Sequence, residues 1–248
     1  MEKTYTFQEI TKQDELVKLF RLRYQVYGNS DLAPLLKKNE HEMDIDVFDL
    51  HSRFFGIWCN NELAAGIRAV VDKRDYYNPL VYEIGHKYNF YNGEADSQEK
   101  LVSAGFADFP FLSYASVPVE IKRFYDEQRK DKKVFMSSRC VIDENYRGLK
   151  TIQFLTEGII MIGMLLSGEK AGLAVTDVSI LHSKFYDRYG FSPIKNCSEY
   201  YIGERPSMTI AMFLSTSLSL SSVPQYFHSK FEEMMLEYSS THKITRTL

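Results

Sequence analysis

Two periods of hydrophobic residues run through this chain, and each period predicts a different kind of element. Apolar side chains three or four positions apart form one stripe over residues 13–27, which predicts an amphipathic helix. Further helices are predicted over residues 119–128, 149–167 and 223–238, with a short one ending at Tyr189. Apolar runs bounded by turn residues predict strands over residues 4–9, 51–59, 63–72, 133–142, 172–180, 200–203 and 208–214.

The connections between these elements indicate the fold class. Asn60-Asn61 joins two strands as a hairpin turn, and residues near 76–117 form an irregular, aromatic-rich insertion. The strand, helix and strand over residues 133–180 predict a parallel βαβ unit. Since hairpins surround that unit, we expect an α/β (α+β) fold with a mixed central sheet flanked by helices. One domain spans residues 1–248, and a polar tail follows the last helix.

Composition excludes several functional classes. The formal net charge of −3 gives no bulk attraction to nucleic acid or an anionic membrane. The three cysteines are far apart and form no CxxC pair, so neither a disulfide framework nor a structural metal site is expected. The N-terminus has no apolar signal core, and the longest apolar run, residues 159–166, falls short of the roughly 20 residues that span a bilayer. We therefore expect a cytoplasmic protein without a transmembrane segment.

Three arginines stand in segments that should face inward: Arg23, Arg68 and Arg139. A buried charge is costly unless it is paired and hydrogen-bonded. A short loop supplies the opposite charge with Glu42, Asp44, Asp46 and Asp49. We therefore expect mutual pairing near a cleft. The network either pins the loop to the sheet or also binds a polar acceptor, and the two roles are compatible.

These motifs follow one another in a familiar order. The helix motif 21–27 (RLRYQVY) precedes the acidic loop, then come residues 65–68 (AGIR) and 138–141 (SRCV). The order resembles the acyl-homoserine-lactone autoinducer synthases. It resembles even more their relatives, the long-chain N-acyl amino acid synthases and exosortase-linked N-acyltransferases. The resemblance covers about residues 15–195 and implies a GNAT-like acyl-CoA N-acyltransferase fold.

Two positions depart from the autoinducer-synthase pattern. Those enzymes have a glutamate three residues before the strand arginine, and that position is Met136 here. They also have an aromatic residue after that arginine, which is Cys140 here. The resemblance therefore implies neither homoserine-lactone chemistry nor a glutamate base at position 136.

A second motif suits a thioester donor, because a helix N-terminus offers free backbone N–H groups to a phosphate. Residues 140–151 join a predicted strand to the apolar helix. They resemble the GNAT pyrophosphate loop, with Lys150 and Ile152 where that loop has small residues. The partial match favours acyl carrier protein over coenzyme A as donor, and the alternative is an ordinary strand-to-helix turn capped by Asn145. The expected donor contacts are Cys140, Val141, Ile142, Arg147, Gly148, Leu149, Lys150 and Thr151.

Residues 181–191 resemble the GNAT segment that ends in Tyr-x-x-x-Gly-Phe, here Tyr186 to Phe191. The resemblance implies that Tyr186 protonates the departing thiolate. A tyrosine acid is chemically reasonable because its reference pKa of about 10 exceeds that of a thiol, about 8.5. The alternative is a tyrosine that only packs.

In such a fold two strands splay, and the pantetheine arm binds between them as an extra strand. We expect a carboxylate of the acidic loop to act as base and an arginine to bind the acceptor's carboxylate. Aromatic residues at 88–91 and 106–114 are expected to line a cavity for a medium or long acyl chain. The expected catalytic residues are Tyr186, Glu42, Asp44 and Arg139, and the expected substrate contacts are Arg23, Asp49, Arg68 and Ser138.

Six basic residues between positions 122 and 133 form either a docking patch for acidic acyl carrier protein or a solvated helix end. The sequence thus favours an N-acyltransferase that moves an acyl group from acyl carrier protein or acyl-CoA to a small-molecule amine. Two alternatives stay open. One is an acetyl-CoA-dependent acetyltransferase, and the other is a non-catalytic sensor of acyl thioesters or lipids.

Overall fold

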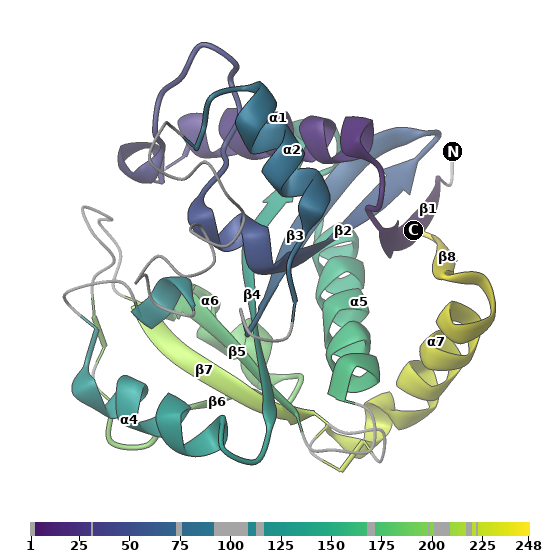
Figure 1. The fold of residues 1–248 in the computed structure, drawn as a ribbon. Helices are drawn as coiled ribbons and strands as arrows, with labels where there is room; N and C mark the ends of the chain where they lie inside the picture. Colours follow the sequence, from purple (N-terminus) through teal and green to yellow (C-terminus); the bar gives the residue numbers. More distant parts are fainter. Residues whose placement is uncertain are drawn as a thin grey trace.

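A computed structural model describes residues 3–30, 32–72, 76–91, 109–112, 117–167, 172–197, 199–200, 209–216, 220–221 and 223–248. Its described strands form one sheet in the order β6-β7-β5-β4-β3-β2-β1-β8 (Figure 1). They are β1 (Thr4–Glu9), β2 (Ser52–Cys59), β3 (Glu62–Val71), β4 (Lys133–Ile142), β5 (Gly172–Ser179), β6 (Ser192–Pro193), β7 (Thr209–Thr216) and β8 (Lys243–Thr247). Among the described strands, only β4 and β5 pair in parallel, so the sheet is mixed as expected.

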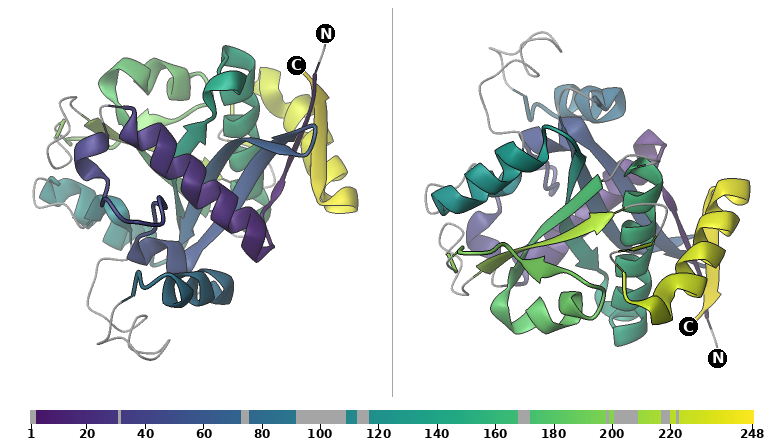
Figure 2. Two further views of the ribbon diagram at one scale, coloured as in Figure 1. Left: turned by 90° about the horizontal axis from the view of Figure 1, so that it is seen from above. Right: turned by 90° about the horizontal axis from the view of Figure 1, so that it is seen from below.

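Helices cover both faces of this sheet (Figures 1 and 2). The described α-helices are α1 (Gln13–Gly28), α2 (Pro79–Lys87), α4 (Val119–Gln128), α5 (Leu149–Ser167), α6 (Ile180–Asp187) and α7 (His228–Thr241). Buried side chains of α5 and α7 pack on one face, and those of α1 and α2 pack on the other. The apolar stripe predicted over residues 13–27 therefore points into a core.

Helix α5 lies directly on the sheet. A Cβ added at Gly158 would overlap the Phe7 ring, and one at Gly163 would overlap the Phe135 ring, so both positions depend on glycine. Among the described helices, α5 alone is long and apolar enough to cross a membrane. In this fold 67% of that stretch is buried, between the sheet and α7.

The parallel strands β4 and β5 separate after their first four residues. They pair only over Lys133–Met136 and Gly172–Val175, although both strands continue. Nearby, Ile67 of β3 lies opposite two residues of β4, Arg139 and Cys140, and this bulge gives Arg139 a left-handed φ of 54°. Bulges bend a strand and are frequent next to active sites. The expected splay is confirmed, and it places the second half of β4 at an open sheet edge.

Several predicted elements have the expected bounds, and three expectations are wrong. The Asn60-Asn61 turn forms with both residues at positive φ, as a tight hairpin turn requires. Residues 76–117 are not wholly irregular, because Asn78 caps α2 and Pro79 occupies its first turn. The last helix begins at His228, not at residue 223, because Gln225–Phe227 forms a separate 3₁₀ turn. The polar tail is strand β8, which pairs with β1 and buries Ile244.

Candidate functional site

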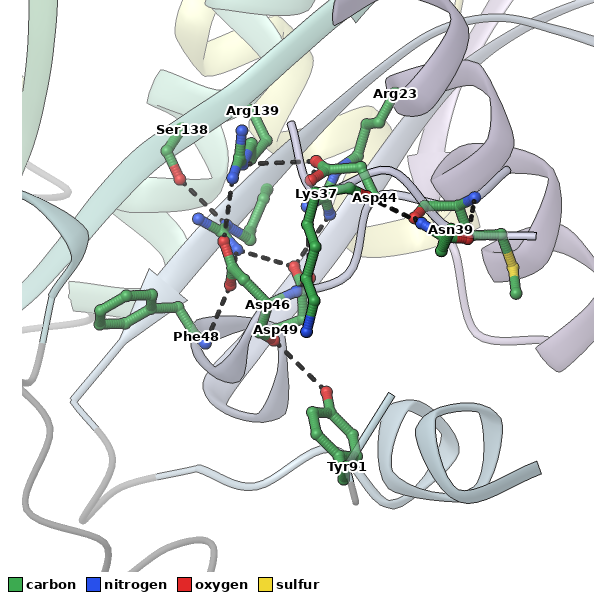
Figure 3. Close-up of polar contacts among 12 residues, drawn as sticks. Arg23, Lys37, Asn39, Asp44, Asp46, Phe48, Asp49, Tyr91, Ser138 and Arg139 are labelled. Atoms are coloured by element: carbon green, nitrogen blue, oxygen red, sulfur yellow. Dashed lines mark hydrogen bonds and ion pairs between the residues drawn. The ribbon is translucent and has the colours of Figure 1, made fainter. Parts of the chain in front are cut away.

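Three arginines and three aspartates meet where α1, β3, β4 and the acidic loop come together (Figure 3). Arg23 of α1 donates Nε to Asp44 Oδ2 at 2.9 Å, and its two Nη atoms reach Asp49 at 2.9 and 3.2 Å. Its guanidinium is fully buried, so this bidentate pair satisfies a charge that water does not reach. The predicted pairing of Arg23 with the acidic loop is confirmed.

Arg68 joins the same network from β3. Its Nη1 donates to Asp46 Oδ1 at 2.6 Å and to Asp49 Oδ1 at 2.8 Å. Its Nε donates to Ser138 Oγ at 3.0 Å, which links β3 to β4 across the sheet. Because only 2% of its side chain is exposed, Arg68 has little surface left for a ligand.

Arg139 differs from the other two arginines in its exposure. The bulge in β4 presents it with 21% of its side chain exposed, while Nη2 donates to Asp46 Oδ2 at 3.2 Å. Its Nε lies 3.4 Å from Asp44 Oδ2, and its guanidinium stands 5.2 Å from the centre of the Tyr27 ring. Arg139 is therefore the one guanidinium of this network that is both fixed and accessible.

The acidic loop owes its shape to a capping box. Asp46 accepts from the Phe48 N–H at 2.9 Å, and Asp49 accepts from the Asp46 N–H at 2.8 Å. The Tyr91 hydroxyl donates to the Asp46 carbonyl at 3.3 Å from the segment that follows α2. Asp46 and Asp49 thus hold the turn and the arginines together.

Charge and burial set the protonation of these groups. Burial alone would raise the pKa of Asp46, but Arg68, Arg139 and Arg23 outweigh it and hold that pKa well below its usual range. Burial alone would lower the pKa of Arg23 and of Arg139, yet the neighbouring aspartates raise both. Burial raises the pKa of Tyr27 to about 12. Arg23, Arg139 and Asp46 are therefore charged at neutral pH.

The donor contacts predicted from the sequence lie along one path. Cys140, Val141 and Ile142 are on the splayed half of β4, and residues 147–150 are exposed at the start of α5. A Cβ at Gly148 would meet nothing within 4 Å, and the φ of Gly148 is not in the left-handed region. Gly148 therefore leaves room for a close approach of a ligand.

Two other donor contacts have internal partners. The Thr151 hydroxyl donates to the Tyr146 carbonyl at 2.9 Å, and Arg147 Nε lies 3.5 Å from the Ile142 carbonyl. Asp143, not Asn145, caps the turn, because its side chain accepts from the Asn145 N–H. Burial raises the pKa of the Cys140 thiol to about 12, so Cys140 is a neutral thiol at physiological pH.

Tyr186 stands on α6, the helix that follows β5. Its ring packs edge-on against Phe185 and Phe191, with centroids 5.4 and 5.6 Å away. Gly190 has a φ of 91°, which fits its predicted place just after the helix. Tyr186 is therefore carried by the helix that follows β5, the strand that separates from β4.

Some predicted residues do not join this arrangement. Glu42 is exposed, has a φ of 51° and contacts none of the three arginines within the described structure. Phe90 and Tyr91 pack against the core formed with α1 and α2. Of residues 106–114, only Phe109 to Leu112 are described, so the other predicted lining residues lie outside the described part of the chain.

The sequence pattern placed Asp46 in the acidic loop but not among the candidate site residues, and it did not place Tyr91 in the network. Asp46 bridges Arg68 and Arg139, but the sequence favoured its neighbours Glu42 and Asp44. A signal was present in the spacing of Asp44 and Asp46, because alternate residues of an extended segment point to the same side. Nothing local to Tyr91 indicates that its hydroxyl reaches the acidic loop.

Comparison with known proteins identifies the fold. No protein-family profile and no curated protein matches the chain, whereas solved structures do. FeeM, an N-acyl amino acid synthase from uncultured soil microbes, is 12% identical and has a TM-score of 0.52, covering 85% of this chain and 91% of its own.

Two other solved structures match over a similar length. BjaI, a CoA-dependent acyl-homoserine lactone synthase solved with SAM and isopentyl-CoA, is 10% identical with a TM-score of 0.55 and coverage of 93% and 89%. MesI, a second CoA-dependent acyl-homoserine lactone synthase, is 10% identical with a TM-score of 0.53 and coverage of 92% and 94%. The chain thus has the GNAT-like fold of N-acyltransferases, and this expectation is confirmed.

Proposed function

We propose that this protein is an N-acyltransferase that moves a medium or long acyl chain from a phosphopantetheine thioester to the amine of an amino acid. One observation carries the proposal: the open edge of β4 and the accessible guanidinium of Arg139 adjoin each other at a single bulge. The open edge suits an extended pantetheine arm, which would bind there as an added strand. Arg139 suits the carboxylate of an acceptor. The structural likeness to FeeM, an N-acyl amino acid synthase, supports this proposal.

The charge balance of the network favours a zwitterionic acceptor. Its three arginines and three aspartates cancel, so an added carboxylate alone would leave an excess negative charge in a half-buried site. An amino acid brings both charges. In the proposed pose its carboxylate meets Arg139 and its ammonium meets the exposed edge of Asp46, of which 25% is accessible.

Transfer would proceed in one addition and one elimination, without an acyl-enzyme. The acceptor amine loses a proton, its nitrogen attacks the thioester carbonyl, and a backbone N–H of the splayed β4 segment stabilises the oxyanion. The C–S bond then breaks, and Tyr186 gives its proton to the thiolate. Cys140 does not serve as nucleophile, because its raised pKa keeps the thiol protonated.

The two predicted bases, Glu42 and Asp44, differ in their surroundings. Asp44 is held by both Arg23 and Arg139, so we assign it to fixing these guanidinium groups. Glu42 has an exposed carboxylate two residues earlier, and it stays our candidate base, either directly or through water.

The donor's phosphate is best assigned to the start of α5, where Arg147 and Lys150 are exposed. The basic segment 122–133 is a weaker choice for carrier-protein docking. It also contains three acids, Asp126, Glu127 and Asp131, and it leads into the opposite end of β4 from Cys140. That strand is about 30 Å long.

The test is a transfer assay with the purified protein. Hexadecanoyl and octanoyl carrier protein, the matching acyl-CoAs and acetyl-CoA are each incubated with a mixture of amino acids, and products are read by mass spectrometry. We expect an N-acyl amino acid with medium or long donors. Consumption of acetyl-CoA alone would indicate an acetyltransferase, and saturable binding of thioesters without turnover would indicate a sensor.

Two variants test the assigned roles. Arg139→Gln should raise the acceptor KM at least tenfold, while Tyr186→Phe should lower kcat with little change in KM. Arg129→Gln is the matched control. Arg129 is outside the network, and its Nη2 lies 3.2 Å from Asp72 Oδ2. If both Arg139→Gln and Tyr186→Phe retain wild-type kinetics, the site assignment is wrong.

A further inference from the structure

A cavity lies near the end of β3 and the start of β4, away from the open edge of β4. Its volume is about 190 Å³, and it is lined by Arg53, Val71, Tyr76, Lys133, Phe135 and Leu166, among others. It opens where β3 ends, β4 begins and α5 ends, which are the lower ends of β4 and α5 in Figure 1. Lys133 is seven residues before Cys140 on β4, so the two positions are roughly 20 Å apart.

The walls of this cavity set the size of the occupant. Val71, Phe135 and Leu166 supply apolar surface from β3, β4 and α5. A cavity of about 150 Å³ holds a benzene molecule. The present cavity is about a quarter larger, so it has room for one aromatic ring or an alkyl chain of about seven carbons, and not for a cofactor or a peptide.

The polar groups of the cavity set the charge of the occupant. Arg53 uses Nε and Nη2 on Glu9, at 2.7 and 2.5 Å, which leaves the donors of Nη1 for another acceptor. Lys133 is exposed and makes no ion pair with any described residue. Burial raises the pKa of Tyr76, so its hydroxyl stays a hydrogen-bond donor. The Ser167 hydroxyl is already engaged by the Gly163 carbonyl and by Thr216.

We propose that this cavity binds a small monocarboxylate with a single apolar group, such as a medium-chain fatty acid. The apolar group would fill the space between Val71, Phe135 and Leu166, and the carboxylate would meet Lys133 and the remaining donors of Arg53. The lining residues include no acid, and Glu9, which is not among them, binds Arg53 through Nε and Nη2 and leaves Nη1. The proposal is independent of acyl transfer, because a free carboxylate is not an acyl donor.

The test is calorimetric titration of the full chain with octanoate, and with octanol as the same chain without charge. We expect octanoate to bind at least fivefold more tightly than octanol. Lys133→Glu should weaken octanoate about tenfold and leave octanol within twofold, since an exposed charge contact is worth up to about 1 kcal/mol and the reversal adds repulsion. Lys130→Glu, the same charge change at an exposed residue outside the cavity, should leave both affinities unchanged.

A cavity-filling variant, Leu166→Trp, should abolish binding of both probes. If it does not fold, Lys133→Glu carries the test alone, because Lys133 is exposed and unpaired in the described structure. Equal octanoate affinity in the wild type, Lys133→Glu and Lys130→Glu would overturn the proposal, because the ligand would then bind elsewhere. Absence of saturable octanoate binding to the wild type would overturn it as well.

Discussion

Replacing Asp49 by asparagine should remove a large share of the stability of this fold. The Asp49 carboxylate is fully buried and accepts three hydrogen bonds from two guanidinium groups, Nη1 and Nη2 of Arg23 and Nη1 of Arg68. Asparagine keeps one acceptor oxygen, turns an N–H₂ group toward the arginines and leaves one buried positive charge without its counter-charge. Removing one partner of a buried ion pair costs about 3–5 kcal/mol. Domains are stable by about 5–15 kcal/mol, so about a fifth or more of the total would be lost.

Urea denaturation followed by circular dichroism measures this loss. Thermal denaturation gives a second measure. For a chain of this length, a loss of 1 kcal/mol lowers Tm by about 2–4 °C, so Tm should fall by roughly 6–20 °C. Glu40→Gln is the control, since that carboxylate is 84% exposed and should change stability by less than about 0.5 kcal/mol. In the double variant Arg23→Gln/Asp49→Asn, the two losses should fall short of their sum by about 0.5–3 kcal/mol. A loss below about 1 kcal/mol for Asp49→Asn would refute the view that this network holds the loop to the sheet.

Four further outcomes follow from the structure. The pKa of Asp46 is held below its unfolded value, so its stabilisation is present above about pH 4 and is lost as pH falls through the folded pKa; Asp46→Asn should flatten the acid limb of urea midpoints measured from pH 7 to 2. Because burial raises the pKa of Cys140 to about 12, iodoacetamide should label it slowly at pH 7.5, and Cys140→Ser should keep acyl transfer, as mass spectrometry of peptides and products would show. Asn61→Val should cost about 1–2 kcal/mol by urea denaturation, since it forces a β-branched residue into a φ of 67°, whereas Asn61→Gly should not. Gly148→Ala should leave Tm unchanged and weaken acyl-CoA binding, while Gly163→Ala should lower Tm because its Cβ would overlap Phe135.

Long periodic segments were predictable because a pattern that repeats over many residues distinguishes a helix from a strand, which a short apolar run does not. The bounds of α4, α5 and β4 match the prediction, and each carries an uninterrupted pattern over ten or more residues. Helix α2 was missed, although Asn78 followed by Pro79 is a start signal, since its nine residues include few with strong helical preference. Strand β8 was missed because its five residues gain their structure from pairing with β1 across the whole chain.

The composition of the candidate site was more predictable than its geometry. Arginines in apolar segments and a cluster of acids were enough to predict the network. The sequence did not reveal that a bulge gives Arg139 a positive φ, because arginine has no local preference for that conformation. Asp46 joins the network and Glu42 does not, because the capping box fixes the loop. Its hydrogen bonds form only once the turn exists, so the sequence did not reveal this difference.

The last strand of the sheet pairs with the first, and this order has a consequence during synthesis. The Leu248 N–H donates to the Lys3 carbonyl at 3.1 Å, and β8 covers the outer edge of β1 (Figure 1). On the ribosome, that edge stays uncovered while the roughly 240 intervening residues are made, about 10 to 50 s at ordinary elongation rates. An open strand edge invites pairing with other nascent chains. Pairing between neighbouring chains on one polysome is therefore a hazard that the late arrival of β8 creates, and a holdase chaperone bound over β1 would reduce it.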